Sequence, residues 1–169
     1  MKPSSDAVSR LVVTDTGPLI ALARSGYLHL LPALFGRIVI PASVSKELRL
    51  DDGLPGSSVL RTALRDKAIY QVIAAKNVPE LLSELLDPGE AEAIALAEER
   101  SCLLLIDERK GRTVARKRGI PFVGTGRLLI AAKRNGDLDN VSIVLEEFRR
   151  SGYRLSDSLY EEILRLAGE

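Results

Sequence analysis

The sequence predicts an α/β domain of three layers (α/β/α), in which helices cover both faces of a mostly parallel central sheet. Short, wholly apolar runs such as residues 38–40 and 102–106 are typical of parallel strands that are buried on both faces. These runs alternate with longer segments in which apolar residues recur at helical spacing. The length of 169 residues suits one such domain with a small terminal extension.

The first half begins with a strand at 11–14, because a short β-branched run ends there in Asp15 and the pair Gly17-Pro18. Pro41 ends a second strand at 38–40 and suits the first turn of a helix. The other elements expected in this half are helices at 19–23, 28–34, 42–50 and 59–66, a loop at 51–58 and a strand at 69–74.

The second half contains a marked helix start at Asp87-Pro88-Gly89-Glu90, with Asp87 as N-cap, Pro88 in the first turn and Glu90 three residues after the cap. This helix is expected to run to about residue 99. The other elements expected are helices at 79–86, 111–118, 127–135, 141–151 and 157–167, and strands at 102–106 and 121–123.

The composition excludes several classes of protein. With 46% hydrophobic and 28% charged residues, the chain is typical of globular proteins. One Cys cannot form an internal disulfide, and one His excludes a His-cluster metal site, so a metal would have to bind carboxylates. No apolar run could span a membrane and no signal peptide is recognisable, which predicts a cytoplasmic protein. A net charge of +1 argues against coating nucleic acid through bulk charge.

Two acidic residues follow buried strands, Asp15 after the first and Asp107 after the run CLLLI. The carboxyl ends of parallel strands line the functional crevice of open α/β sheets, so we expect these two carboxylates to lie close together. The alternative interpretation, in which each Asp only caps the next helix or turn, stays open.

Glu47 shares a helical face with the apolar residues Val44 and Leu48. A Glu on such a face is unusual unless it is paired, so Glu47 is a third candidate. The alternative is a side chain at the edge of the apolar stripe that extends to solvent.

Two glutamates compete for a fourth role in the helix that starts at Asp87. Glu90 aligns with the apolar face of that helix, whereas Glu92 aligns with its more polar side. Helical geometry therefore favours Glu90 in the crevice, with Glu92 as the alternative. Glu90 could instead serve only the capping box of the helix.

Carboxylates that converge on one point repel one another unless a cation neutralises them. Mg²⁺ or Mn²⁺ takes oxygen ligands and is held by few carboxylates together with substrate phosphate. Such an ion supports hydrolysis of a phosphodiester.

The sequence resembles the PIN domains, a superfamily of metal-dependent ribonucleases that includes the VapC-like toxins. The resemblance rests on VVTDTGPLIALAR, IPASVSKEL, PGEAEAIALAEE and LLLIDERKGRTVA, and it covers residues 11–135. It is especially similar to a poorly characterised bacterial and archaeal subgroup. It implies a PIN-like fold over 11–135, an N-terminal tail at 1–10, and a helical extension at 136–169 packed on the same domain, which could dimerise, hold a partner or cap the core.

The resemblance also implies an activity: cleavage of single-stranded RNA with Mg²⁺ or Mn²⁺, by a homodimer that is paired with a small antitoxin. The residues that match the catalytic acids are Asp15, Glu47, Glu90 and Asp107, of which Asp15, Glu90 and Asp107 are expected to bind the metal, with Glu108 as a possible auxiliary. Glu90 stands where many members have Asp, which affects the metal geometry. Thr125 matches a Ser or Thr position near the metal.

A basic segment follows Asp107, with six Lys or Arg among residues 109–118. Its residues could position phosphate, although a solvated helix face is an equal alternative. The residues expected to bind substrate are Thr16, Arg109, Lys110, Arg112 and Thr125.

Other functions fit less well. Asp15-Thr16-Gly17 matches the triplet of aspartic proteases, but that fold is all-β. A phosphatase would need a second Asp where Gly17 stands. The main alternative is a PIN-like module that binds RNA or protein without cleaving it.

Overall fold

The computed structural model of the chain describes residues 10–169 and confirms the predicted α/β architecture. Five parallel strands form one sheet in the order β3-β2-β1-β4-β5. Their bounds are β1 Leu11–Thr14, β2 Arg37–Pro41, β3 Tyr70–Ile73, β4 Leu103–Leu105 and β5 Phe122–Val123. The central strand β1 pairs with both neighbours, so that Val13 lies between Val39 and Leu104.

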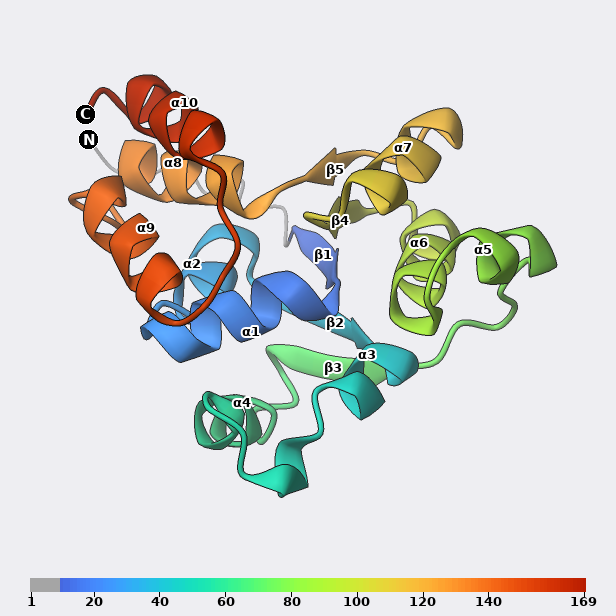
Figure 1. Cartoon of the computed structure of the whole chain (residues 1–169). Coiled ribbons are helices and arrows are strands. Elements are labelled where there is room, and N and C mark those ends of the chain that lie inside the picture. Colours follow the sequence, from blue (N-terminus) through green and yellow to red (C-terminus); the bar gives the residue numbers. More distant parts are fainter. Residues whose placement is uncertain (1–9) are drawn as a thin grey trace.

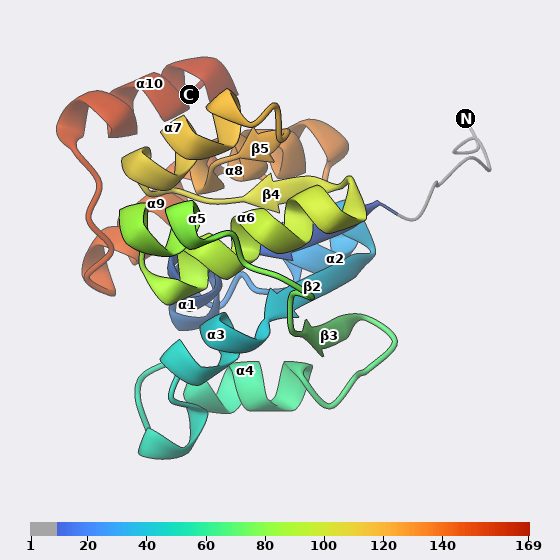
Figure 2. The same ribbon diagram turned by 90° about the vertical axis from the view of Figure 1, so that its right-hand side faces the viewer.

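Helices pack on both faces of the sheet (Figure 1). One face carries helices from the start and the end of the chain: α1 (Thr16–Ser25), α2 (Leu30–Phe35), α4 (Ser57–Ala63), α8 (Thr125–Asn135), α9 (Val141–Arg150) and α10 (Asp157–Ala167). Figure 2 views the other face, which is covered by α5 (Glu80–Leu85), α6 (Pro88–Arg100) and α7 (Arg109–Lys117). The short helix α3 (Ala42–Glu47) and a 3₁₀ turn at Leu50–Asp52 follow β2.

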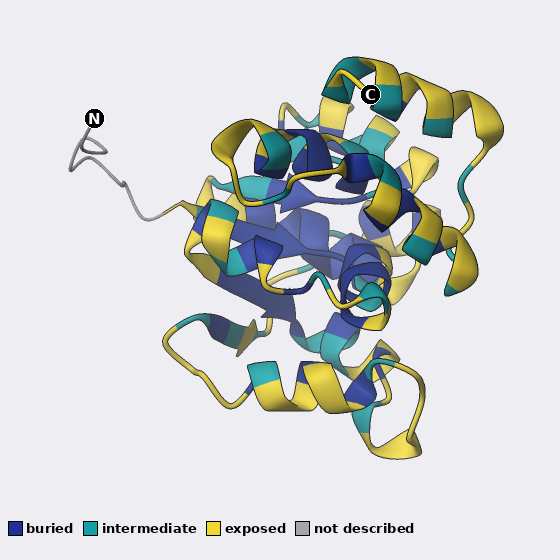
Figure 3. Cartoon of the chain, turned by 90° about the vertical axis from the view of Figure 1, so that its left-hand side faces the viewer, coloured by how far each residue is buried: buried dark blue, intermediate teal, exposed yellow. Residues whose placement is uncertain are grey.

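The strands divide the core into two apolar clusters by simple alternation of side chains. Val12 packs with the cluster under α1 and α8, whereas Val13 packs with the cluster under α6. The buried strands are visible as a continuous dark band between the helices (Figure 3). This two-sided burial explains why the central strands are mostly apolar in sequence.

Several predicted helix bounds differ from those observed. The helix predicted at 42–50 ends at Glu47, because the chain turns through a left-handed conformation at Arg49, with φ of 48°, before the 3₁₀ turn. Four other helices, α1, α4, α7 and α8, start two or three residues earlier than predicted. In α1, Pro18 lies in the first turn, where proline does not break a helix. The predicted tail at 1–10 lies outside the described residues up to residue 9.

The topology places the candidate site. From β1 the chain moves to β2 and β3 on one side, and it returns to β4 and β5 on the other side of β1. The carboxyl ends of β1 and β4 are therefore a topological switch point, where open α/β sheets form their functional crevice. Asp15 directly follows β1, and Asp107 comes two residues after β4.

Candidate functional site

A cavity of about 710 Å³ lies at the carboxyl ends of β1 and β4. It is bordered by the starts of α1 and α6 on one side and by α8, α9 and α10 on the other. All four predicted catalytic acids contribute to its wall, together with two further acids. The acidic wall residues are Asp15, Glu47, Asp87, Glu90, Asp107 and Glu108.

Asp15 is buried at the end of β1, with 6% of its surface exposed. Its backbone amide donates to the carbonyl of Leu105 over 3.0 Å, which extends the β1–β4 pairing by one residue and fixes Asp15 beside β4. Burial raises the pKa of Asp15 to about 7. The backbone amide of Thr16 lowers this pKa, whereas the nearby charges of Glu90 and Glu47 raise it further.

Glu90 is equally buried, in the first turn of α6. The predicted capping arrangement is present, because the backbone amide of Glu90 donates to Asp87 Oδ1 over 2.9 Å. Gly111 of α7 lies next to this carboxyl group, and a Cβ at position 111 would clash with Ile106 Cδ1. Burial raises the pKa of Glu90 to about 7, followed by repulsion from Asp87 and Glu108.

Glu92 is also 6% exposed, so the side of α6 that carries it is buried rather than open to solvent. Helix α6 is buried on every side from Gly89 to Ala97, because it packs against the sheet, α3 and α5. Glu92 lies away from the cavity wall and accepts backbone N–H bonds from Ser43 and Ala75 at 2.6 and 2.9 Å. Burial alone would raise the pKa of Glu92, but these hydrogen bonds hold it below its ordinary value.

Glu47 is the last residue of α3 and is the exposed member of the predicted four. Its Oε1 accepts the backbone N–H of Gly89 at 2.8 Å, and its Oε2 accepts the hydroxyl of Thr16 at 2.6 Å. Glu47 thereby joins the N-terminus of α6 to the N-terminus of α1. A Cβ at position 89 would come within 2.5 Å of Glu47 Oε1, so glycine is required for this close approach.

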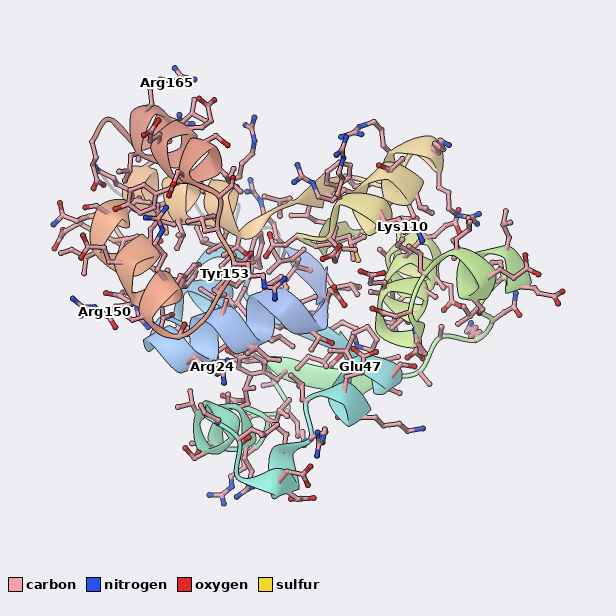
Figure 4. The ribbon with its side chains drawn as sticks, in the orientation of Figure 1. Arg24, Glu47, Lys110, Arg150, Tyr153 and Arg165 are labelled. Atoms are coloured by element: carbon pink, nitrogen blue, oxygen red, sulfur yellow. The ribbon has the colours of Figure 1, made fainter. Side chains whose placement is uncertain are left out.

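Asp107 accepts three hydrogen bonds. The backbone amide of Thr125 donates to Oδ1 over 2.7 Å, and the Thr125 hydroxyl donates to Oδ2 over 2.6 Å. The third donor is the hydroxyl of Tyr153, at 2.5 Å from Oδ2. Tyr153 and Glu47 come from opposite flanks of the site, the connection between α9 and α10 and the helix α3 (Figure 4). Burial, and then the charge of Asp107, raise the pKa of the Tyr153 hydroxyl, which therefore stays protonated and remains a donor.

The predicted substrate-binding residues fall into two groups. Thr16, Arg112 and Thr125 line the cavity, although both threonine hydroxyls donate to acidic side chains. Arg109 and Lys110 are exposed at the start of α7 and lie outside the cavity wall.

Arg112 is half-buried at the cavity, and its guanidinium is held over the ring of Phe122. The guanidinium carbons of Arg112 and Arg116 lie 5.6 and 5.3 Å from the ring centre of Phe122. Such cation–π contacts hold an arginine in place without neutralising its charge. The site therefore carries a fixed positive charge beside its acids.

The donor chemistry of the site fits a divalent cation. Within residues 10–169, no group of three or more Asp, Glu, His or Cys side chains is arranged to hold a metal by itself. Mg²⁺, however, is commonly bound by one or two carboxylates, with water and substrate phosphate as the other ligands. Asp15 and Glu90 are buried, and neighbouring acids add to the rise in the pKa of each, so a cation would favour their charged forms.

Comparison with known protein families agrees with this arrangement. A sequence model of a family described as a PIN domain matches residues 11–169. The chain is a PIN-domain protein. PIN domains are generally nucleases and typically use divalent metals. The match extends beyond residue 135, so helices α9 and α10 lie within the PIN-domain match.

The search of curated proteins finds no match to this PIN-domain protein. Within residues 10–169, no helix has both the length and the apolar character needed to cross a membrane.

Sequence reasoning missed Tyr153. Its partner Asp107 is 46 residues away, and no local pattern reveals a hydrogen bond over that separation. The one available signal is its position in Gly152-Tyr153-Arg154, a polar connection between two amphipathic helices, where a tyrosine has no helical face to fill.

Proposed function

We propose that this PIN-domain protein is a metal-dependent endoribonuclease that cleaves single-stranded RNA. The observation that carries the proposal is the pair Asp15 and Glu90, two buried carboxylates that face one cavity and whose pKa values are both raised to about 7. Burying two like charges together costs stability, and such arrangements are concentrated at functional sites. The family match supports nuclease chemistry in general.

In this proposal Asp15, Glu90 and Asp107 would hold Mg²⁺ or Mn²⁺ together with water and substrate phosphate. When bound, such an ion acts as a Lewis acid that activates water and offsets charge on the phosphodiester. Asp15 and Glu90 supply buried oxygens. Asp107 supplies an oxygen whose orientation is fixed by Thr125.

Glu47 contributes by holding two helix starts together. Its hydrogen bonds to Gly89 and Thr16 keep Glu90 and Asp15 in a fixed relation, because each acid lies one residue from a bonded partner. Glu47 is also exposed at the cavity, so it can contact water there.

The basic residues would bind the RNA backbone. Arg112 lies in the cavity wall and would contact the phosphate next to the acids. Arg109 and Lys110 are exposed one turn earlier on α7, where they would contact flanking phosphates (Lys110 is labelled in Figure 4). Thr16 and Thr125 stay proposed substrate contacts through their place in the wall.

We further propose that the protein is the toxin of a toxin–antitoxin pair, acting as a homodimer that a small antitoxin binds. The PIN-domain match and the sequence resemblance to VapC-like toxins support this assignment. A second candidate is a PIN module that binds RNA or protein without cleavage. It is favoured by Asp107, whose carboxylate already accepts three hydrogen bonds.

A cleavage assay separates the two candidates. Purified protein without a partner is incubated with labelled single-stranded RNAs, with Mg²⁺ or Mn²⁺ and with a chelator. We expect cleavage that needs the metal and is lost in Asp15→Asn, while Asp139→Asn, an exposed Asp outside the cavity wall, leaves it unchanged. RNA binding without cleavage supports the second candidate, and cleavage that survives Asp15→Asn contradicts the proposed site.

A further inference from the structure

We propose that Tyr153 is a positioning residue, which fixes the Asp107 carboxylate so that a single oxygen, Oδ1, is presented to the cavity. The inference rests on the proposed function, since it assigns a role toward the same metal site. It concerns a residue of the connection between α9 and α10, which the sequence analysis left without a role.

Hydrogen bonds occupy all but one of the acceptor positions of Asp107. A carboxylate offers about four lone-pair positions, two on each oxygen. Oδ2 of Asp107 receives two hydroxyl donors, from Tyr153 and Thr125, and Oδ1 receives the backbone amide of Thr125. One position remains, and it lies on Oδ1. The carboxylate can therefore bind a cation through that oxygen while Oδ2 stays occupied.

The absence of a side chain at Gly124 leaves space beside Oδ1 of Asp107. Gly124 lies beside it, and a Cβ at position 124 would come within 3.2 Å of Oδ1, closer than most real Cβ contacts. The glycine thus leaves space where a side chain would crowd the one free acceptor position. Asp107 and Gly124 both belong to the cavity wall.

Tyr153 is held in place by packing and by a backbone hydrogen bond. Its ring packs against Phe148 with centroids 5.2 Å apart, and its backbone amide donates to the Phe148 carbonyl over 2.9 Å. The connection is tied to α1 as well, because Arg24 donates to the carbonyl of Ser151 over 3.3 Å. A hydroxyl held from two helices can fix its acceptor, whereas a mobile one could not.

The donors to Asp107 come from two different elements. Thr125 alone could hold the carboxylate plane, but its hydroxyl and amide come from one residue at the start of α8. Tyr153 adds a donor from a second element, the connection between α9 and α10, 46 residues from Asp107. Groups that orient a metal ligand typically change metal affinity or activity by about 10- to 100-fold when removed.

The test compares Tyr153→Phe with Tyr160→Phe in the full chain. Tyr160 belongs to α10, its ring packs against the guanidinium of Arg149, and it lies outside the cavity wall. It is therefore a matched control. We expect Tyr153→Phe to weaken Mn²⁺ binding, measured by calorimetry without RNA, by about 10-fold or more. We also expect a similar fall in kcat, with KM for RNA changed less than about twofold, because the contact acts on the metal ligand.

A double-mutant cycle separates positioning from folding. If Tyr153 acts through Asp107, Tyr153→Phe has no further effect on Mn²⁺ affinity in an Asp107→Asn background. Unchanged Mn²⁺ affinity and kcat in Tyr153→Phe would overturn the assignment while leaving the proposed function intact. An equal loss in both backgrounds would also overturn it. Wild-type protein that binds no Mn²⁺ and cleaves no RNA would overturn the proposed function and this assignment together.

Discussion

Two glutamates of α6, separated by one residue, have the same 6% exposure and opposite electrostatics. Glu92 accepts backbone amides from α3 and from the segment after β3, and its pKa lies below the ordinary value. Glu90 lies in the acidic cavity wall, and its pKa is raised to about 7. Burial alone therefore does not distinguish a structural carboxylate from a functional candidate.

The distinction is made by the donors that each carboxylate meets. Glu92 is compensated by two backbone amides, so its charge stabilises the fold. Glu90 and Asp15 are surrounded by other acids, so their charges cost stability until a cation is present. Asp107 and Glu47 are intermediate, since each lines the cavity and also accepts hydrogen bonds from neighbouring elements.

The largest expected effect is on cleavage. Glu90→Gln removes a charged ligand and should lower kcat by about 10³-fold, several kcal/mol of barrier. Glu92→Gln leaves the cavity wall unchanged and should stay within about tenfold of wild type. A fluorescent single-stranded RNA assay measures both variants, and equal losses in the two would contradict the contrast between these acids.

The next effect is on stability without metal, where the two variants should differ in sign. A raised pKa means that the folded state disfavours the charged form of Glu90, so its contribution is present below the unfolded value of about 4.5 and is lost as pH rises towards 7. Glu90→Gln should therefore stabilise the protein at pH 8 by about 2 kcal/mol. Urea unfolding in a chelator measures this.

Glu92 should behave in the opposite way. Its lowered pKa gives stability that is present above the ordinary value and is lost as pH falls through the folded value. Glu92→Gln should destabilise the protein by about 1–3 kcal/mol at neutral pH, because an amide nitrogen meets the donors of Ser43 and Ala75. The difference in unfolding free energy between Glu92→Gln and wild type should shrink at acidic pH. Stabilisation by both Glu90→Gln and Glu92→Gln would contradict the contrast between the two glutamates.

A smaller effect tests the close approach of Glu47 to α6. Gly89 and Gly17 occupy the same place, the second residue, in their helices α6 and α1. Gly17→Ala meets open space and should stabilise its helix by about 0.5–1 kcal/mol. Gly89→Ala forces the Glu47 carboxylate to move and costs its hydrogen bond to the amide of residue 89, so this variant should give no net stabilisation. Denaturant midpoints compare them, and stabilisation by Gly89→Ala would refute the contact.

The smallest effect concerns the basic side of the cavity. Arg112→Ala should weaken RNA binding several-fold and reduce the slope of log affinity against log salt by about 0.7, the value for one phosphate contact to a single strand. Arg134→Ala, which removes an exposed arginine outside the cavity wall, is the control. Fluorescence anisotropy across a salt series measures the slopes, and identical slopes would argue against a phosphate contact by Arg112.

Much of the fold could be predicted from the sequence because its signals are local. Apolar runs gave the buried strands, and Asp87-Pro88 gave the start of α6 within a residue. The helix bounds near Arg49 and Thr125 were missed, since a left-handed residue and an early helix start depend on how the chain packs rather than on periodicity. The alternation of strands and helices predicted a mostly parallel sheet, whereas the order of its strands was not predicted.

The site was predictable in part for the same reason. An acid that directly follows a parallel strand lies at the carboxyl edge of the sheet, so Asp15 and Asp107 could be assigned to one crevice. Helical periodicity favoured Glu90 over Glu92 for the crevice, but it did not reveal that Glu92 is buried too, because α6 has no solvent-facing side over its buried stretch. Tyr153 was missed because its hydroxyl meets Asp107 only through the packing of α9 against α1.

We propose above all that Asp15 and Glu90, two buried carboxylates in the wall of one cavity, bind a divalent cation there. Crystals soaked in Mn²⁺ and measured by anomalous diffraction test this most directly. The account predicts an anomalous peak within about 2.0–2.5 Å of oxygens of Asp15 and Glu90, with Oδ1 of Asp107 facing it. No peak in the cavity at millimolar Mn²⁺, or a peak only at other acids such as Asp51 and Asp52, would contradict it.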